Sequence, residues 1–344
     1  MEKRRDPYWD NLKLALMFLV VLGHFLMPVK SSEGPFVKAL FYWIYLFHMQ
    51  AFVFVSGYSS KSYVRKSGKE NKLTGFLVTF VFFTVCIEII EFIFTHGIRL
   101  RILFRITGAP WYMLAMFFWY LLIPFISRVR PVISLTLSIV LGVLCGMVSG
   151  LGSFLTLSRA IVFFSAFLAG YYFDGAWIQN IGKRGRLLSA GILLAVFLVL
   201  FFRQSAMSDF LKIIYAKSSY SKLGLTYAAG CAYRLLWYFV SAVMTMSFLS
   251  IIPRRKFFFT YIGGRTLSIY IVHRLIRDVF KYLDLYEYLG DGVYLLGLCV
   301  CISVAVIFIT SADPFYHLVN SVFRLRTNLH HDTSKDRFQA ARVN

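Results

Sequence analysis

Long apolar runs recur along the whole chain, and they constrain its fold more than any other feature. Hydrophobic residues make up 58% of the 344 residues. Most of them fall in stretches near the length that a helix needs to cross the hydrocarbon core of a bilayer. The pattern predicts an all-α, polytopic membrane protein of about ten transmembrane helices. We place the spans at residues 11–29, 37–58, 73–96, 110–127, 132–149, 159–173, 186–203, 232–252, 259–281 and 292–312.

The connections between these spans are too short to hold a separate soluble domain. We therefore expect a single transmembrane domain over residues 1–327, followed by a polar, disordered tail over residues 328–344. The five cysteines lie in or beside apolar runs and have no metal-ligand spacing. They are typical of packed thiols, and no metal is expected.

The chain is strongly basic, with a formal net charge of +21. Lys and Arg concentrate before the first span and in the loops that return to the same side of the membrane. This bias predicts a multi-pass protein with both termini in the cytoplasm, facing anionic lipid. Nucleic acid is not an expected partner, because no basic segment comes with a soluble domain that would present it.

Two costly polar residues, Lys13 and His24, lie within the first apolar run. Ionisable groups at membrane depth are expensive, so each is a candidate functional residue. Eleven helical steps come within about 20° of three full turns, which places both side chains on one face of the helix. They are separated by about 16 Å along the helix axis, roughly half the hydrocarbon thickness.

The cytoplasmic end of the first two spans is predicted to form a binding site. Lys13 lies near that edge, and the second span returns there with Ser56 and Lys61. Cationic and small residues together suit a phosphorylated cosubstrate. Asp10, one helical turn before Lys13, is expected to pair with it. The alternative is a basic membrane anchor with ordinary small-residue packing.

A second set of polar and aromatic side chains is predicted nearer the opposite face of the membrane. The set consists of His24, His48, Trp111, Tyr112, Arg159 and His273. The two aromatic residues also suit an interfacial belt, and the arginine also suits an anchor that extends outward. Histidines at membrane depth in three different spans nevertheless indicate a site.

His24 is the candidate catalytic residue of this set. A neutral imidazole can take a proton from a hydroxyl group, which is the task of a general base. It can equally carry an acyl group as a nucleophile. Glu88 or Glu91 in the third span is a candidate for orienting the imidazole, as a carboxylate does in a catalytic triad.

Five ordered segments together resemble a known family. They are DNLK at 10–13 followed by GH at 23–24; FHM at 47–49 followed by FVSGY at 54–58; WYMLA at 111–115; SR at 158–159 leading to GYY at 170–172; and LSIYIVH at 267–273. This set is similar to acyltransferase family 3, integral-membrane acyltransferases that O-acetylate bacterial surface glycans. The nearest branch by resemblance is that of the fucose 4-O-acetylase-like proteins.

The resemblance implies an enzyme of the bacterial inner membrane that moves an acetyl group from cytoplasmic acetyl-CoA to a hydroxyl of a cell-envelope carbohydrate. His24 would be the catalytic histidine, and Lys13, Ser56 and Lys61 would hold the donor. The remaining candidates would bind the acceptor or support the site: Asp10, His48, Trp111, Tyr112, Arg159 and His273. Lys13 stands where much of the family has arginine, which keeps the charge but loses the bidentate fork.

Two other classes of function remain open at this point. A transporter or flippase for a glycan or small solute would also carry polar groups at membrane depth. Such proteins often contain repeated halves, and this chain has no obvious internal repeat. A catalytically silent scaffold is the third reading, and it predicts that apolar residues can replace Lys13 and His24 without consequence.

Overall fold

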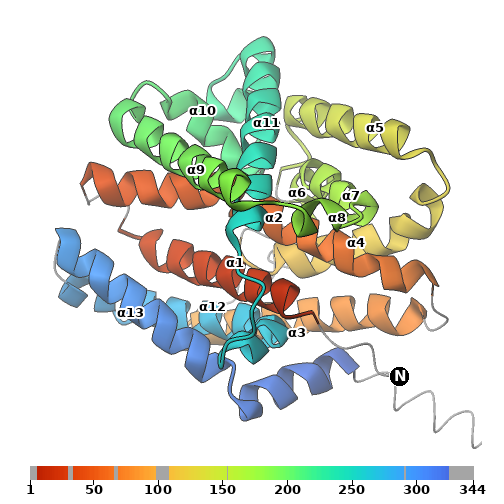
Figure 1. Ribbon diagram of the computed structural model, residues 1–344. Coiled ribbons are helices and arrows are strands. Elements are labelled where there is room, and N and C mark those ends of the chain that lie inside the picture. The colour runs from red at the N-terminus through yellow and green to blue at the C-terminus, as the bar shows by residue number, and fades with distance from the viewer. Residues whose placement is uncertain are drawn as a thin grey trace, which may run out of the picture.

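Helices make up most of the described part of the molecule (Figure 1). The computed structural model describes residues 6–29, 34–65, 69–97, 108–152, 154–289 and 292–324. This part of the chain contains no β-strand, which confirms the all-α prediction. The predicted polar tail, residues 328–344, lies outside the described residues.

Each of the ten predicted spans contains one helix or two consecutive helices. They are α1 (Pro7–Leu26), α2 (Pro35–Arg65), α3 (Lys69–Thr95), α4 (Trp111–Ile126), α5 (Pro131–Leu144), α6 (Leu157–Val162) with α7 (Phe164–Tyr172), α9 (Lys183–Arg203), α11 (Tyr227–Ile251), α12 (Thr266–Tyr282) and α13 (Gly292–Thr310). The short helices α8 (Ala176–Gln179) and α10 (Ser208–Lys212) lie in connecting segments.

Not all of these helices are long enough to cross a bilayer alone. Among the described residues, five are long and apolar enough: α1, α2, α3, α9 and α11. A sixth span results if α13 and the helix Asp313–Arg324, which meet at a 65° bend, count as one. Three further apolar helices have only 10–17 residues. The chain is therefore polytopic, while length alone supports fewer full spans than the ten predicted.

Helix α1 lies at the centre of the assembly. It contacts α2 on one side and α12 and α13 on another (Figure 1). In its most apolar window 67% of the residues are buried, against 11% for α9. The outward faces of α3, α5 and α9 instead expose large apolar side chains, such as Ile93, Val132 and Leu188. These faces are suited to contact lipid, and α1 is suited to carry the site.

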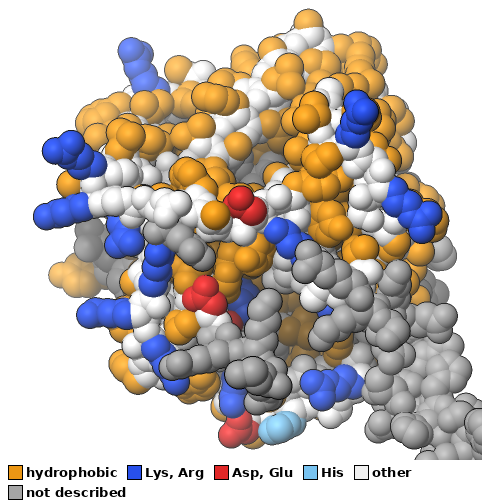
Figure 2. Space-filling view, turned by 45° about the vertical axis from the view of Figure 1, so that its right-hand side comes forward, with side chains coloured by type: hydrophobic (Ala, Val, Ile, Leu, Met, Phe, Trp, Pro, Cys, Tyr) orange, Lys and Arg blue, Asp and Glu red, His pale blue; other side chains and the backbone are white. Residues whose placement is uncertain are grey.

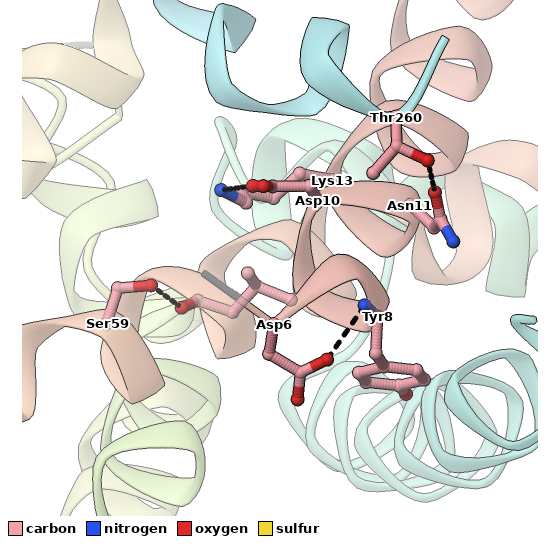
Figure 3. Close-up of polar contacts among 8 residues, drawn as sticks. Asp6, Tyr8, Asp10, Asn11, Lys13, Ser59 and Thr260 are labelled. Carbon is pink, nitrogen blue, oxygen red and sulfur yellow. Dashed lines mark hydrogen bonds and ion pairs between the residues drawn. The ribbon is translucent and has the colours of Figure 1, made fainter. Parts of the chain in front are cut away.

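The start of α1 is fixed by local sequence and by a neighbouring segment. Asp6 caps the helix, its carboxylate accepting a hydrogen bond from the Tyr8 backbone N–H at 3.0 Å (Figure 3). Pro7 follows at the first helical position, where its missing N–H costs nothing. Gly263, in the 3₁₀ turn Thr260–Gly264, lies so close that a Cβ there would be 1.9 Å from the Asp10 carbonyl oxygen. This contact brings the start of α12 against α1.

Helices α2 and α7 also pack in close backbone contact. A Cβ on Gly57 of α2 would lie 1.9 Å from the Phe167 carbonyl oxygen, and a Cβ on Gly170 of α7 would lie 1.8 Å from that of Phe54. Small residues that allow such an approach are typical of helix pairs in membranes. The contact holds α2, which carries several of the predicted site residues, in a fixed position against α7.

Candidate active site

Two histidines from distant parts of the chain form the centre of the candidate site. His24 near the end of α1 and His273 in α12 lie with their rings stacked, 5.1 Å between centroids. The His24 Nδ1 atom is 2.9 Å from the His273 Nε2 atom. His273 is fully buried, and its Nδ1 atom is 2.7 Å from the Ile269 carbonyl oxygen one turn earlier.

This chain of contacts assigns the protons of the neutral pair. A carbonyl oxygen only accepts, so His273 Nδ1 must carry the proton and donate it to Ile269. His273 Nε2 is then an acceptor, and His24 Nδ1 must donate to it. The lone pair of His24 is therefore on Nε2, which is the nitrogen available to act as a base. The partner that orients His24 in the structure is thus the imidazole of His273, and the hypothesis that Glu88 or Glu91 orients an imidazole stays a prediction.

His24 lines a cavity of about 440 Å³ between α1, α2, α6 and α12. The cavity brings together four of the predicted residues: His24, His48, Trp111 and Arg159. His48 donates from Nδ1 to the Ile44 carbonyl oxygen at 2.7 Å and is almost fully buried. His273 lies directly behind His24, so the set predicted for this half of the protein largely meets in one place.

The same cavity is lined by cationic side chains that the sequence analysis did not single out. Lys217, Arg274 and Arg277 join Arg159 in its wall. Asp278 pairs with both arginines of α12, at 2.9 Å from Arg274 and 2.8 Å from Arg277. Partial burial and the neighbouring Arg159 guanidinium lower the pKa of Lys217, which lies in the connection between α9 and α11.

A second, smaller cavity of about 200 Å³ lies toward the beginning of α1. Lys13, Ser56 and Tyr112 line it, so the structure brings together two of the three predicted donor residues. Lys13 makes the expected ion pair with Asp10, with 2.7 Å between Nζ and the carboxylate oxygen (Figure 3). Figure 2, which turns the side where α1 begins toward the viewer, shows Lys and Arg side chains spread over an otherwise largely hydrophobic face.

The two cavities adjoin at a pair of tyrosines. Tyr112 and Tyr270 have ring centroids 5.5 Å apart, and both line the cavity of Lys13. The Tyr270 hydroxyl donates to the carbonyl oxygen of Ala109, a residue in the wall of the His24 cavity. The Ser56 hydroxyl donates to the Phe52 carbonyl and so accepts from the Tyr112 hydroxyl. Tyr112 therefore lies with the predicted donor residues, whereas its neighbour Trp111 faces His24.

Lys61 lies away from both cavities. Its Nζ atom donates to the Phe173 carbonyl oxygen and lies 4.6 Å from the centroid of the Tyr58 ring. These two contacts hold the Lys61 ammonium at the junction of α2 and α7. The structure thus separates this lysine from Lys13 and Ser56, with which it was grouped.

Asn11 is a residue whose function the sequence did not reveal. Its amide nitrogen donates to the carbonyl oxygens of Pro253 and Arg255, each at 2.9 Å. Its amide oxygen accepts from the Thr260 hydroxyl at 2.7 Å (Figure 3). Asn11 therefore fastens the segment before α12 to α1, which positions His273 against His24.

Three charged residues at the His24 cavity could have been predicted from the sequence. Arg274, Arg277 and Asp278 fall within the predicted span 259–281, where ionisable residues are costly. Their spacing from His273 places them within two turns of one helix. Tyr45 and Lys217 gave no such signal, because only the folded chain brings them to the cavity.

Comparison with known proteins identifies the family of the chain. Residues 6–312 match the family described as an acyltransferase domain, acyltransferase family 3, and the matched range includes the histidine pair and the lining of the His24 cavity. No curated protein and no solved structure matches the chain. Since the match covers most of the 344 residues, the chain belongs to acyltransferase family 3, a family of integral-membrane acyltransferases.

Proposed function

We propose that this protein transfers an acetyl group from acetyl-CoA to a hydroxyl of a cell-envelope carbohydrate in the bacterial inner membrane. One observation carries the proposal: the His24–His273 pair, whose hydrogen bonds leave a basic nitrogen on His24 beside a cavity. The chain belongs to an acyltransferase family, and acyl transfer to a hydroxyl is a reaction in which a general base can act. The fucose 4-O-acetylase-like branch stays a prediction.

The donor is proposed to bind from the cytoplasmic side, where both termini would lie. Its phosphate groups would meet Lys13, and Ser56 would line the path of the pantetheine arm. Lys13 and His24 are about 16 Å apart along α1, a distance that a long, thin arm can bridge. The arm must pass Tyr112 and Tyr270, so these rings have to move aside when the donor binds.

The acceptor is proposed to occupy the cavity of His24. Trp111 offers an aromatic surface there, and Arg159 lies 5.2 Å from its ring centroid. His48 and His24 both line the same space. A sugar ring has apolar faces and hydroxyl groups at its edge, which suits a wall of this mixed character.

The reaction then follows from the assigned protons. His24 Nε2 takes the proton of the acceptor hydroxyl while the hydroxyl oxygen forms a bond to the acetyl carbonyl carbon. His273 accepts the hydrogen bond from His24 Nδ1 and stabilises the imidazolium. The carbon–sulfur bond of the thioester breaks, and the CoA thiolate takes the proton from His24. The products are the O-acetyl ester and free CoA thiol.

The test uses purified protein in proteoliposomes with radiolabelled acetyl-CoA on the side of the vesicle that Lys13 faces. The proposal predicts covalent label on a carbohydrate acceptor and release of CoA in equal amount. Flux of a solute without covalent labelling would instead favour the transporter class and would contradict the proposal.

A further inference from the structure

We infer that the carbohydrate that enters the His24 cavity carries an anionic group, a carboxylate or a phosphate. The inference rests on the proposed function and names the substrate class of the same site. It follows from the charge of the cavity wall, a buried donor without an acceptor, and the aromatic rings that lie beside the cations.

The charge of the wall is strongly unbalanced. Arg159, Lys217, Arg274 and Arg277 line the cavity, and no Asp or Glu does so among its described residues. Asp278, which does not line the cavity, pairs with both arginines of α12. Cations in a membrane protein's interior are costly and are usually paired. One carboxylate, that of Asp278, does not balance the four cations of the wall. An anionic ligand would offset the remaining positive charge.

One hydrogen-bond donor of the wall lacks an acceptor. The hydroxyl of Tyr45 is buried and has no hydrogen-bond partner among the described residues. Tyr45 lines the cavity. Buried polar groups are nearly always satisfied in folded proteins, by protein, water or ligand. Carboxylate and phosphate oxygens are strong acceptors and would satisfy donors of this kind.

The cations also lie beside an aromatic surface. The Arg159 guanidinium is 5.2 Å from the centroid of the Trp111 ring, and Lys217 is 5.7 Å from that of Tyr215. Each pair places an apolar face next to a positive charge. This arrangement fits a sugar ring that packs on the aromatic group while its charged substituent meets the cation.

The phosphates of CoA are a poorer match to these cations. In CoA the pantetheine arm separates the phosphates from the thioester. His24 and the four cations share one cavity of about 440 Å³, so phosphates held there would carry the thioester away from His24. Lys13, in the second cavity, provides a separate cation at the distance that the arm requires.

The experiment compares acceptors that share one sugar scaffold and differ in the substituent at C6, which is neutral in one and anionic in two. Acetyl transfer from radiolabelled acetyl-CoA is measured with p-nitrophenyl glucoside, its 6-phosphate, and p-nitrophenyl glucuronide. The proteins are the wild type, Arg159→Gln and Lys217→Met, with Lys222→Met as the matched control. Lys222 lies in the same connection, but it donates to the Ser149 carbonyl at 3.0 Å and does not line the cavity.

The wild type is expected to prefer at least one anionic acceptor over the glucoside by about tenfold or more in kcat/KM, the gain of a charge-assisted hydrogen bond. Arg159→Gln and Lys217→Met should each reduce that preference about fivefold or more, without raising the KM for acetyl-CoA. The control should leave it unchanged. Preference for the carboxylate or for the phosphate distinguishes the two sources of charge.

Three results would overturn the inference: no preference for charge, a preference that both variants retain, or a rise in the KM for acetyl-CoA alone. Failure of the proposed function looks different, because no acceptor is then acetylated. Binding of the glucuronide and the glucoside to the His24→Ala protein, measured by calorimetry, still tests the inference in that case. Tighter binding of the glucuronide sustains it, and equal binding refutes it.

Discussion

Replacement of His273 by phenylalanine is expected to impair catalysis while the acetyl-CoA site is retained. The substitution keeps an aromatic ring beside His24 and removes the nitrogen that accepts from His24 Nδ1 at 2.9 Å. His24 then loses the contact that fixes its tautomer and its ring orientation. It also loses the hydrogen bond that strengthens when the imidazole gains a proton.

The magnitude follows from that hydrogen bond. A hydrogen bond to a charged group contributes about 1.5–3 kcal/mol, and about 1.4 kcal/mol corresponds to a factor of ten in rate. His273→Phe should therefore lower kcat about 10- to 150-fold. His273→Gln places an amide oxygen within reach of His24 Nδ1, so its kcat should stay within about tenfold of the wild type.

The assay is initial-rate acetyl transfer in proteoliposomes, with the KM for acetyl-CoA measured in parallel. Thermal unfolding of each protein shows whether the variants fold. A His273→Phe protein that folds and retains kcat within about twofold would refute the acceptor role of His273. Equal losses in the Phe and Gln proteins would refute it as well, because only one of them lacks an acceptor.

The remaining predictions concern the donor site and the packing that supports both cavities. Lys13→Met should raise the KM for acetyl-CoA about tenfold, with Lys13→Arg close to the wild type, and an unchanged KM would leave Lys13 as an anchor only. Gly57→Ala should lower the free energy of unfolding by about 1–3 kcal/mol, because its Cβ would meet a backbone oxygen of α7 at 1.9 Å. Gly191→Ala on α9 is the matched control, since nothing lies within 4 Å of a Cβ there. Thermal unfolding in detergent measures both, and equal melting temperatures would contradict the close packing. Asn11→Leu keeps a side chain of similar volume but removes three hydrogen bonds. It should lower the free energy of unfolding by about 1–3 kcal/mol and also lower kcat. A variant with the wild-type kcat would contradict this function of Asn11.

The helical architecture was predictable because apolar length and secondary structure are tightly linked in membrane proteins. A chain in hydrocarbon must satisfy its backbone groups internally, so each apolar run becomes a helix. The boundaries were less predictable. The ninth predicted span begins with the 3₁₀ turn Thr260–Gly264, and α12 starts only at Thr266. Its contact with α1 depends on Gly263 and on the hydrogen bonds of Asn11, which no local pattern encodes.

The sequence predicted which residues belong to the site better than it predicted which of them contact one another. The spacing of Lys13 and His24 placed them on one face of α1, and each does line a cavity. The hydrogen bond between His24 and His273 joins residues 249 positions apart, so no spacing rule could give it. Tyr112 and Trp111 are neighbours in sequence, yet they face different cavities. Such a division depends on how α4 packs, which the sequence alone does not determine.

The turnover of the His24→Ala protein tests the central claim most directly. Wild type and variant are compared in proteoliposomes at saturating radiolabelled acetyl-CoA, with retained donor binding and a matching melting temperature as controls. The account predicts a loss of at least about a hundredfold in acetyl transfer, the contribution of a positioned general base. It also predicts no covalent acetyl label on the wild-type protein itself, in a sample denatured rapidly at neutral pH. Turnover of His24→Ala near that of the wild type would contradict the role of His24. An acetyl label on a histidine of the wild type would contradict direct transfer and indicate an acyl-enzyme intermediate.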